Sequence, residues 1–143
     1  MFERVYTVVD YWDGPREGVA DLQGCPHVFQ AEWDKGADGD DYARTFLLRP
    51  ISRKAFEAAL EDWTIWLRWE EAFHAGDTTE QSHPALPEDR SRHEELKAIL
   101  AAELRTLKGP SLRANATFRA PVGVTPTRRA SSPLEIEWSV LTK

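Results

Sequence analysis

Three ionisable residues, spaced to meet at one end of a pair of helices, are the best candidates for chemistry in this chain. Glu70 and His74 are four residues apart and fall on the same side of a predicted helix over residues 53–75. His93 lies at the start of the apolar stripe of a second predicted helix. In an antiparallel helical hairpin the last turn of the first helix meets the first turn of the second. We therefore expect Glu70, His74 and His93 to approach one another.

This cluster has two interpretations. A carboxylate with two or three imidazoles, including that of His83 in the connecting loop, suits Zn²⁺ or another divalent ion, and it could also work as an acid–base pair. Alternatively, Glu70 and His74 hydrogen-bond each other as a polar plug that closes the helical junction, which is the interpretation we favour. His93 lacks the second histidine of the H-E-x-x-H motif, so that class of zinc protease is not predicted.

The tryptophans offer a second candidate site. Of the six in the chain, Trp63 and Trp138 lie on clear core faces of their predicted elements. The four that have no such face are Trp12, Trp33, Trp66 and Trp69. Indole rings are favoured at binding surfaces because they combine a large apolar face with a polar edge, but they also fill cores. Core packing and a shared ligand-binding groove are therefore both open.

Hydrophobic periodicity and breaker residues predict the elements that position these side chains. Ser52 is a suitable N-cap for the first helix, and Gly76 is a natural residue to end it. Alternation with a period of two predicts the strands, and Gln23-Gly24 predicts a tight hairpin turn. The predicted strands are 4–11, 18–22, 27–33, 45–51, 112–120 and 134–141, and the predicted helices are 53–75 and 88–107.

The order of these elements predicts the fold class. Four strands are followed by two helices and then by two more strands, and grouped strands favour α+β over alternating βα units. We predict a single domain over residues 1–143, with a mainly antiparallel sheet of five to six strands. We expect the two helices to form an antiparallel hairpin packed on one face of that sheet.

Composition limits the classes of partner. The chain has 143 residues and a net charge of −6, which disfavours nucleic acid because phosphate backbones require a basic surface. A single cysteine, Cys25, allows no internal disulfide and suits the cytosol. The sequence shows no signal peptide and no apolar span of membrane length, so we expect a cytoplasmic protein with no membrane partner.

Other motifs are incomplete. The acidic stretch 34–41 lacks the second ligand and the final glutamate of an EF-hand loop. Cys25 and His27 could share a strand face, but no third residue is available to orient a nucleophile pair. The chain also has no glycine-rich phosphate loop and no G-x-S-x-G elbow.

Several strings of the sequence carry a resemblance. The strings DYWDGPREGVAD with GCPHVF, then LEDWTIWLRWEEAFH, then HPALPEDRSRHEEL, resemble a group of small bacterial proteins of unknown function. The resemblance covers roughly residues 5–107 and implies a bacterial, cytosolic protein. It implies no activity, and it assigns no residue to catalysis.

These observations predict a small cytosolic module that binds a protein or a small molecule, without an identifiable catalytic motif. One alternative is a metal-dependent hydrolase that uses Glu70, His74 and His93. We expect no cofactor apart from the divalent metal, such as Zn²⁺, of that alternative. The other is an immunity-type inhibitor of a basic protein, because small size and negative charge suit that role.

Overall fold

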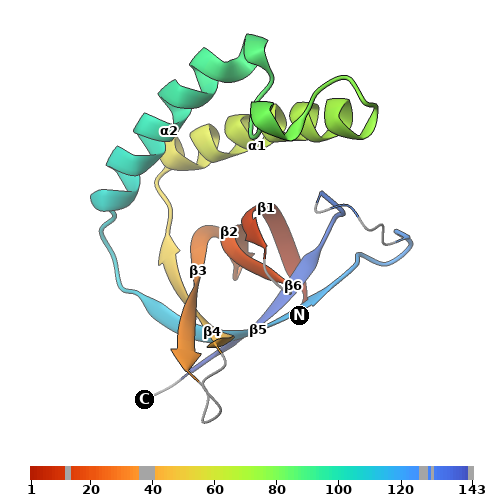
Figure 1. The fold of residues 1–143 in the computed structure, drawn as a ribbon. Helices are drawn as coiled ribbons and strands as arrows, with labels where there is room; N and C mark the ends of the chain where they lie inside the picture. Colours follow the sequence, from red (N-terminus) through yellow and green to blue (C-terminus); the bar gives the residue numbers. More distant parts are fainter. Residues whose placement is uncertain (12–13, 36–40, 126–128, 130, 142–143) are drawn as a thin grey trace. The chain divides into compact units, whose positions relative to one another are not determined.

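The chain forms two compact units. The computed structural model describes residues 1–11, 14–35, 41–125, 129 and 131–141, with the backbone alone for 33–35 and 41–44. One unit consists of Met1–Ile51 and Lys108–Lys143 and contains the six strands (Figure 1). The other unit, Ser52–Leu107, contains both α-helices and is inserted between the two segments of the first. The sequence pattern, from which we predicted one domain, does not reveal this division.

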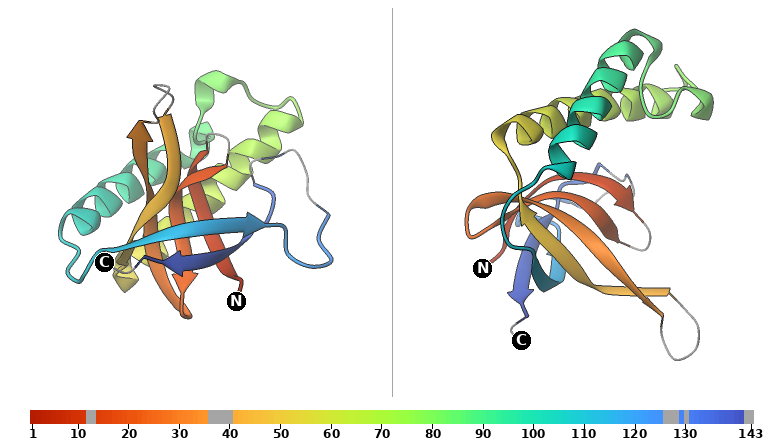
Figure 2. Two further views of the ribbon diagram at one scale, coloured as in Figure 1. Left: turned by 90° about the horizontal axis from the view of Figure 1, so that it is seen from below. Right: turned by 90° about the vertical axis from the view of Figure 1, so that its left-hand side faces the viewer.

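The six strands form a closed antiparallel barrel in which each strand pairs with its neighbours in sequence and β6 returns to β1 (Figure 2). The strands are β1 (Glu3–Tyr11), β2 (Pro15–Leu22), β3 (Cys25–Lys35), β4 (Asp41–Pro50), β5 (Leu112–Arg119) and β6 (Glu135–Val140). The α+β class and the six antiparallel strands are confirmed. The predicted open sheet with a helical hairpin on one face is wrong, because inward-facing alternation along a strand is the same in an open sheet and in a barrel.

The first two strands approach each other unusually closely. The pairing of β1 with β2 shifts register at three places, and such irregularities increase the local bend and twist of a strand. At one of them the Val19 amide donates to the Thr7 hydroxyl oxygen at 3.0 Å. A Cβ atom on Gly18 would lie 2.0 Å from the Thr7 carbonyl oxygen, so only glycine fits there.

The turn between β2 and β3 forms as the sequence predicts. Gln23 and Gly24 both have positive φ, at 54° and 77°, which is the pattern of a two-residue type I′ hairpin. The carboxylate of Glu3 accepts hydrogen bonds from both turn amides, at 3.0 Å from Gln23 and 2.8 Å from Gly24. The start of β1 is therefore fastened to this turn.

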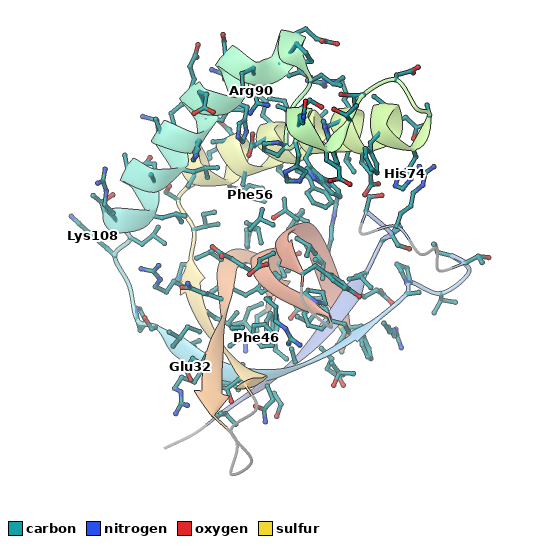
Figure 3. All side chains as sticks on the ribbon, in the orientation of Figure 1. Glu32, Phe46, Phe56, His74, Arg90 and Lys108 are labelled. Atoms are coloured by element: carbon teal, nitrogen blue, oxygen red, sulfur yellow. The ribbon has the colours of Figure 1, made fainter. Side chains whose placement is uncertain are left out.

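Aromatic side chains fill the barrel. The Phe29 ring is fully buried and lies 5.8 Å from that of Phe46, 6.2 Å from that of Phe118 and 5.9 Å from that of Trp138, measured between ring centroids. Phe46 lies inside the ring of strands (Figure 3). The Trp138 indole N–H donates to the Asp21 carbonyl oxygen at 3.0 Å, so its polar edge is satisfied. The interior is thus a packed core.

The helical unit begins and ends where local signals place its boundaries. Helix α1 spans Arg53–His74, and the Ser52 hydroxyl oxygen accepts from the Ala55 amide at 3.2 Å, which confirms the predicted N-cap. Gly76 has a φ of 81° just after the helix. Helix α2 spans Arg90–Arg105, and the segment before it contains two short 3₁₀ turns, η1 (Glu80–Ser82) and η2 (Pro87–Asp89).

Ion pairs join α1 to the segment that contains α2 in reverse order along the chain. Arg68 pairs with Asp89 just before α2, whereas Glu61, two turns earlier on α1, pairs with Arg92 further along the chain. The apolar contact between the helices is small. Its buried members are Ala58, Ile65, Ala85 and Leu96, with Ile99 and Leu100 packed against them.

Candidate functional site

The three residues of the predicted junction cluster have separate surroundings. Glu70 is buried, whereas His74 is exposed at the end of α1, where its ring meets the edge of Phe73 (Figure 3). His93 donates through Nδ1 to Oδ1 of Asp62 at 2.7 Å. Asp62 and Glu70 are eight residues apart, or about 12 Å along a helix. The carboxylate that His93 finds is therefore not the one that the helical wheel suggested.

A metal role for this cluster gains no support from the geometry. Among the residues whose side chains are described, no three His, Cys, Asp or Glu side chains gather in a way that could hold an ion. A divalent metal normally takes at least three such protein ligands. The metal-dependent hydrolase thus stays an untested alternative.

His83 is part of an aromatic cluster at the end of α1. The buried ring of Trp69 stacks on Phe73 at 5.0 Å, and the His83 ring meets Trp69 edge-on at 4.6 Å, measured between centroids. The Trp69 indole N–H donates to the Ser82 hydroxyl at 2.8 Å. Arg90 donates to the Ser82 carbonyl oxygen at 2.7 Å. These contacts fasten the connecting segment to both helices, and the exposed His83 contributes its edge-on contact with Trp69.

Two arginine–carboxylate pairs join the helices on their exposed sides. Arg92 donates to both carboxylate oxygens of Glu61, at 2.6 and 2.7 Å, and Arg68 donates to both of Asp89 at 3.0 Å. The hydrogen bond from its arginine lowers the pKa of each carboxyl group, Glu61 and Asp89. Both pairs hold the helices together. In each pair both carboxylate oxygens already accept a hydrogen bond from the arginine, which favours a structural role over a chemical one.

The tryptophans of α1 pack in two separate pairs. Trp66 stacks on Trp63, with ring centroids 5.0 Å apart and an interplanar angle of 23°, while Trp69 stacks on Phe73. Trp12 lies outside the described residues, and the side chain of Trp33 is not among those described. The shared groove of the four tryptophans therefore stays a prediction.

Among the described residues, the ladder between β1 and β6 ends early in β1. On one side, β1 pairs with β2 from Val5 to Tyr11. On the other side its pairing with β6 involves only Glu3 and Arg4, and among the described residues no strand continues that ladder along the rest of β1. The side chains at the far end of this edge are exposed, with 66% of Val9 and 55% of Tyr11 accessible to solvent.

Two acidic residues face each other at the exposed end of this edge. Asp10 on β1 is directly opposite Glu17 on β2 in the ladder. Burial of the Glu17 carboxyl group raises its pKa, and the negative charge of Asp10 raises it further. Like charges directly opposite each other destabilise a sheet. Neither carboxylate has an ion-pair partner among the described side chains.

Other carboxylates on the outside of the barrel are paired across strands. Glu32 accepts from Arg113 at 2.8 Å, and Glu135 accepts from Arg119 at 2.9 Å (Glu32 is labelled in Figure 3). Residues of opposite charge thus pair across the outer surface of the barrel at these two places. Asp10 and Glu17 differ because they repel each other at the place where the ladder is open.

Comparison of the chain with protein-family models, with curated proteins and with solved structures gave no match. The resemblance to a group of small bacterial proteins therefore stays a prediction. No helix in the described part of the chain is long and apolar enough to cross a membrane. The geometry of the β1 edge is therefore the basis for any functional proposal.

Sequence reasoning missed the β1 edge. It predicted the strand over residues 4–11 but assigned no role to Val9, Asp10, Tyr11 or Glu17. One signal was available, since an aspartate between two large apolar residues near the end of a strand is unusual for a fully paired position. The pairing that leaves this edge open depends on β6, which is more than a hundred residues away in sequence.

Proposed function

We propose that this chain is a protein-binding module in which β1 accepts an extended segment of a partner as an additional strand. The observation that carries the proposal is the early end of the β1–β6 ladder, which stops at Arg4 although β1 continues to Tyr11. An unpaired edge presents a row of backbone N–H and C=O groups that a partner strand can satisfy. This edge is where we propose that the binding module expected from the sequence takes its partner.

The filled barrel supports a protein partner over a small molecule. Barrels that hold small ligands need interior space, and here Phe29, Phe46, Phe118 and Trp138 occupy the interior with rings in mutual contact. The exposed Val9 and Tyr11 instead lie beside the open ladder, where they would contact side chains of an added strand. An immunity-type inhibitor of a basic protein is one form that such a module would take.

The experiment uses a nine-residue synthetic peptide of alternating valine and threonine with glutamine at its centre. Its comparison peptide carries the same side chains but is N-methylated at successive residues, so neither of its edges can pair with β1. Binding to the full chain is measured by isothermal titration calorimetry. The proposal predicts that the plain peptide binds at least about tenfold tighter than the N-methylated peptide.

Two variants place the interaction on the chain. Val9→Pro disrupts the β1 edge because proline lacks the backbone N–H and does not fit a regular ladder, whereas Val9→Thr keeps both backbone groups. Circular dichroism verifies that each variant stays folded. Loss of binding in Val9→Pro but not in Val9→Thr supports the proposal. Equal binding of the plain and N-methylated peptides contradicts it.

A further inference from the structure

We infer that the segment accepted by β1 carries a lysine or arginine whose charge lies between Asp10 and Glu17. This inference rests on the proposed function, because it concerns the chemistry of the strand that fills the same edge. The partner is a protein in which a basic residue lies within an extended, otherwise apolar segment.

The position of the two carboxylates carries the inference. They are partners in the β1–β2 ladder, so their side chains extend from the same face of the sheet. Asp10 is exposed, and Val9 and Tyr11 on either side of it are exposed as well. A strand added along β1 would therefore place one of its side chains beside this pair. A cation there would turn a repulsive arrangement into two charge-assisted contacts.

The apolar neighbour of Asp10 suits a segment that is apolar around its basic residue. Tyr11 follows Asp10 directly in β1, so strand alternation directs its exposed ring to the opposite face from the carboxylate. Residues on either side of the basic one would lie on that opposite face too, where apolar side chains would contact the ring.

Other occupants fit less well. A free Ca²⁺ ion takes six to eight oxygen ligands, and two carboxylates on a strand edge supply only part of such a set. A second copy of this chain would bring another molecule with a net charge of −6 to an edge that is already acidic. A nucleic acid would place phosphates against the carboxylates. A basic protein segment complements both the backbone and the charge of the edge.

Three peptides test the inference. They share the alternating valine and threonine sequence and carry lysine, glutamine or glutamate at the centre. The repeating sequence lets each peptide shift along the edge in steps of two residues, so that the central side chain can reach Asp10 and Glu17. We expect the lysine peptide to bind the full chain at least about tenfold tighter than the glutamate peptide, with glutamine between them.

A pair of double variants assigns this preference to the two carboxylates. Asp10→Asn with Glu17→Gln removes the charge at the edge and is expected to bring the three affinities within about twofold of one another. Glu88→Gln with Glu94→Gln changes the net charge by the same amount in the helical unit and is expected to keep the preference. Circular dichroism and sedimentation check that both double variants keep the fold and the association state of the wild-type chain.

The outcomes distinguish this inference from the proposed function. If the wild-type chain binds all three peptides alike and N-methylation still abolishes binding, β1 accepts a strand but does not select a basic residue, and the inference is overturned. If N-methylation has no effect, the proposed function fails. If Glu88→Gln with Glu94→Gln removes the preference as fully as the edge variant does, the selectivity comes from net charge, which also overturns the inference.

Discussion

The barrel and the helical unit are stabilised by different kinds of contact. In the barrel, aromatic rings from four strands meet in one interior cluster, and paired charges lie on the outside. In the helical unit the apolar contact is built from small and aliphatic side chains, and polar pairs join the helices around it. The barrel therefore depends on a few large residues, whereas the helical unit distributes its stability over many modest contacts.

This difference also separates the two candidate sites. In the helical unit, His93 hydrogen-bonds Asp62 and the His83 ring contacts Trp69, so two of the histidines that the sequence offered for chemistry join segments of this unit. The barrel, in contrast, carries two features that cost stability. Its β1–β6 ladder ends at Arg4, and the carboxylates of Asp10 and Glu17 are opposite each other. Unsatisfied backbone and repelling charges cost stability, so their presence favours a role in binding.

The largest expected effect comes from the barrel core. Phe29→Ala removes a fully buried ring that contacts three other aromatic rings, and we expect a loss of about 3–5 kcal/mol in the free energy of unfolding. Chemical denaturation followed by circular dichroism measures it. Val122→Ala, at an exposed position, serves as the control and should change stability by less than about 0.5 kcal/mol. A loss below about 1 kcal/mol for Phe29→Ala would show that the ring is not a core residue.

A smaller effect is expected from the aromatic cluster of the helical unit. Trp69→Phe keeps an aromatic ring but removes the N–H that donates to Ser82, and should cost about 1–2 kcal/mol. The matched variant Trp66→Phe removes the indole N–H of a half-buried residue whose ring packs on Trp63, and should cost less. Thermal denaturation compares the two. Equal losses would indicate that the hydrogen bond to Ser82 does not contribute to the free energy of unfolding.

A gain in stability is expected at the acidic pair of the barrel. The pKa of Glu17 is raised above its usual 4.5 in the folded chain, so its ionisation makes folding less favourable as pH rises through the interval above 4.5. Glu17→Gln removes the charge opposite Asp10 and should stabilise the chain at pH 7 by about 0.2–1 kcal/mol. Well below pH 4.5 the difference should vanish, because the carboxyl group is then protonated in both states. A gain that persists at pH 3 would have another cause.

The helical unit should respond to pH with the opposite sign. Hydrogen bonds from Arg68 lower the pKa of Asp89 below its usual 3.8, so the stabilising effect of its ionisation is present above 3.8 and is lost as pH falls through the lowered value. Asp89→Asn should cost about 0–1 kcal/mol at pH 7, as for an exposed ion pair. Urea denaturation at pH 7 and pH 2 should show a cost only at the higher pH. A stabilising effect at pH 7 would mean that the pair is unfavourable.

The sequence predicts what local signals determine. The Ser52 cap, the Gly76 ending and the Gln23-Gly24 turn depend on a few neighbouring residues, and each forms as predicted. Closure of the sheet is not local, because it depends on the pairing of Glu3 and Arg4 with residues near the other end of the chain. The open edge that follows Arg4 could not be predicted for the same reason.

The candidate site in the helices shows a similar limit. A helical wheel gives the direction of each side chain around its axis, and it correctly placed Glu70 on a buried side. It does not give the level at which two helices cross. His93 therefore meets Asp62, two turns before Glu70 on α1.

The central claim is that the open edge of β1 accepts a strand, and amide hydrogen exchange tests it most directly. The exchange of individual backbone amides is followed by NMR in the full chain, with and without a saturating amount of the lysine peptide. The account predicts that amides within residues 5–11 that face away from β2 exchange at least about tenfold more slowly when the peptide is bound, while those of β3 and β4 do not change. Unchanged exchange along β1 in the presence of bound peptide would contradict it.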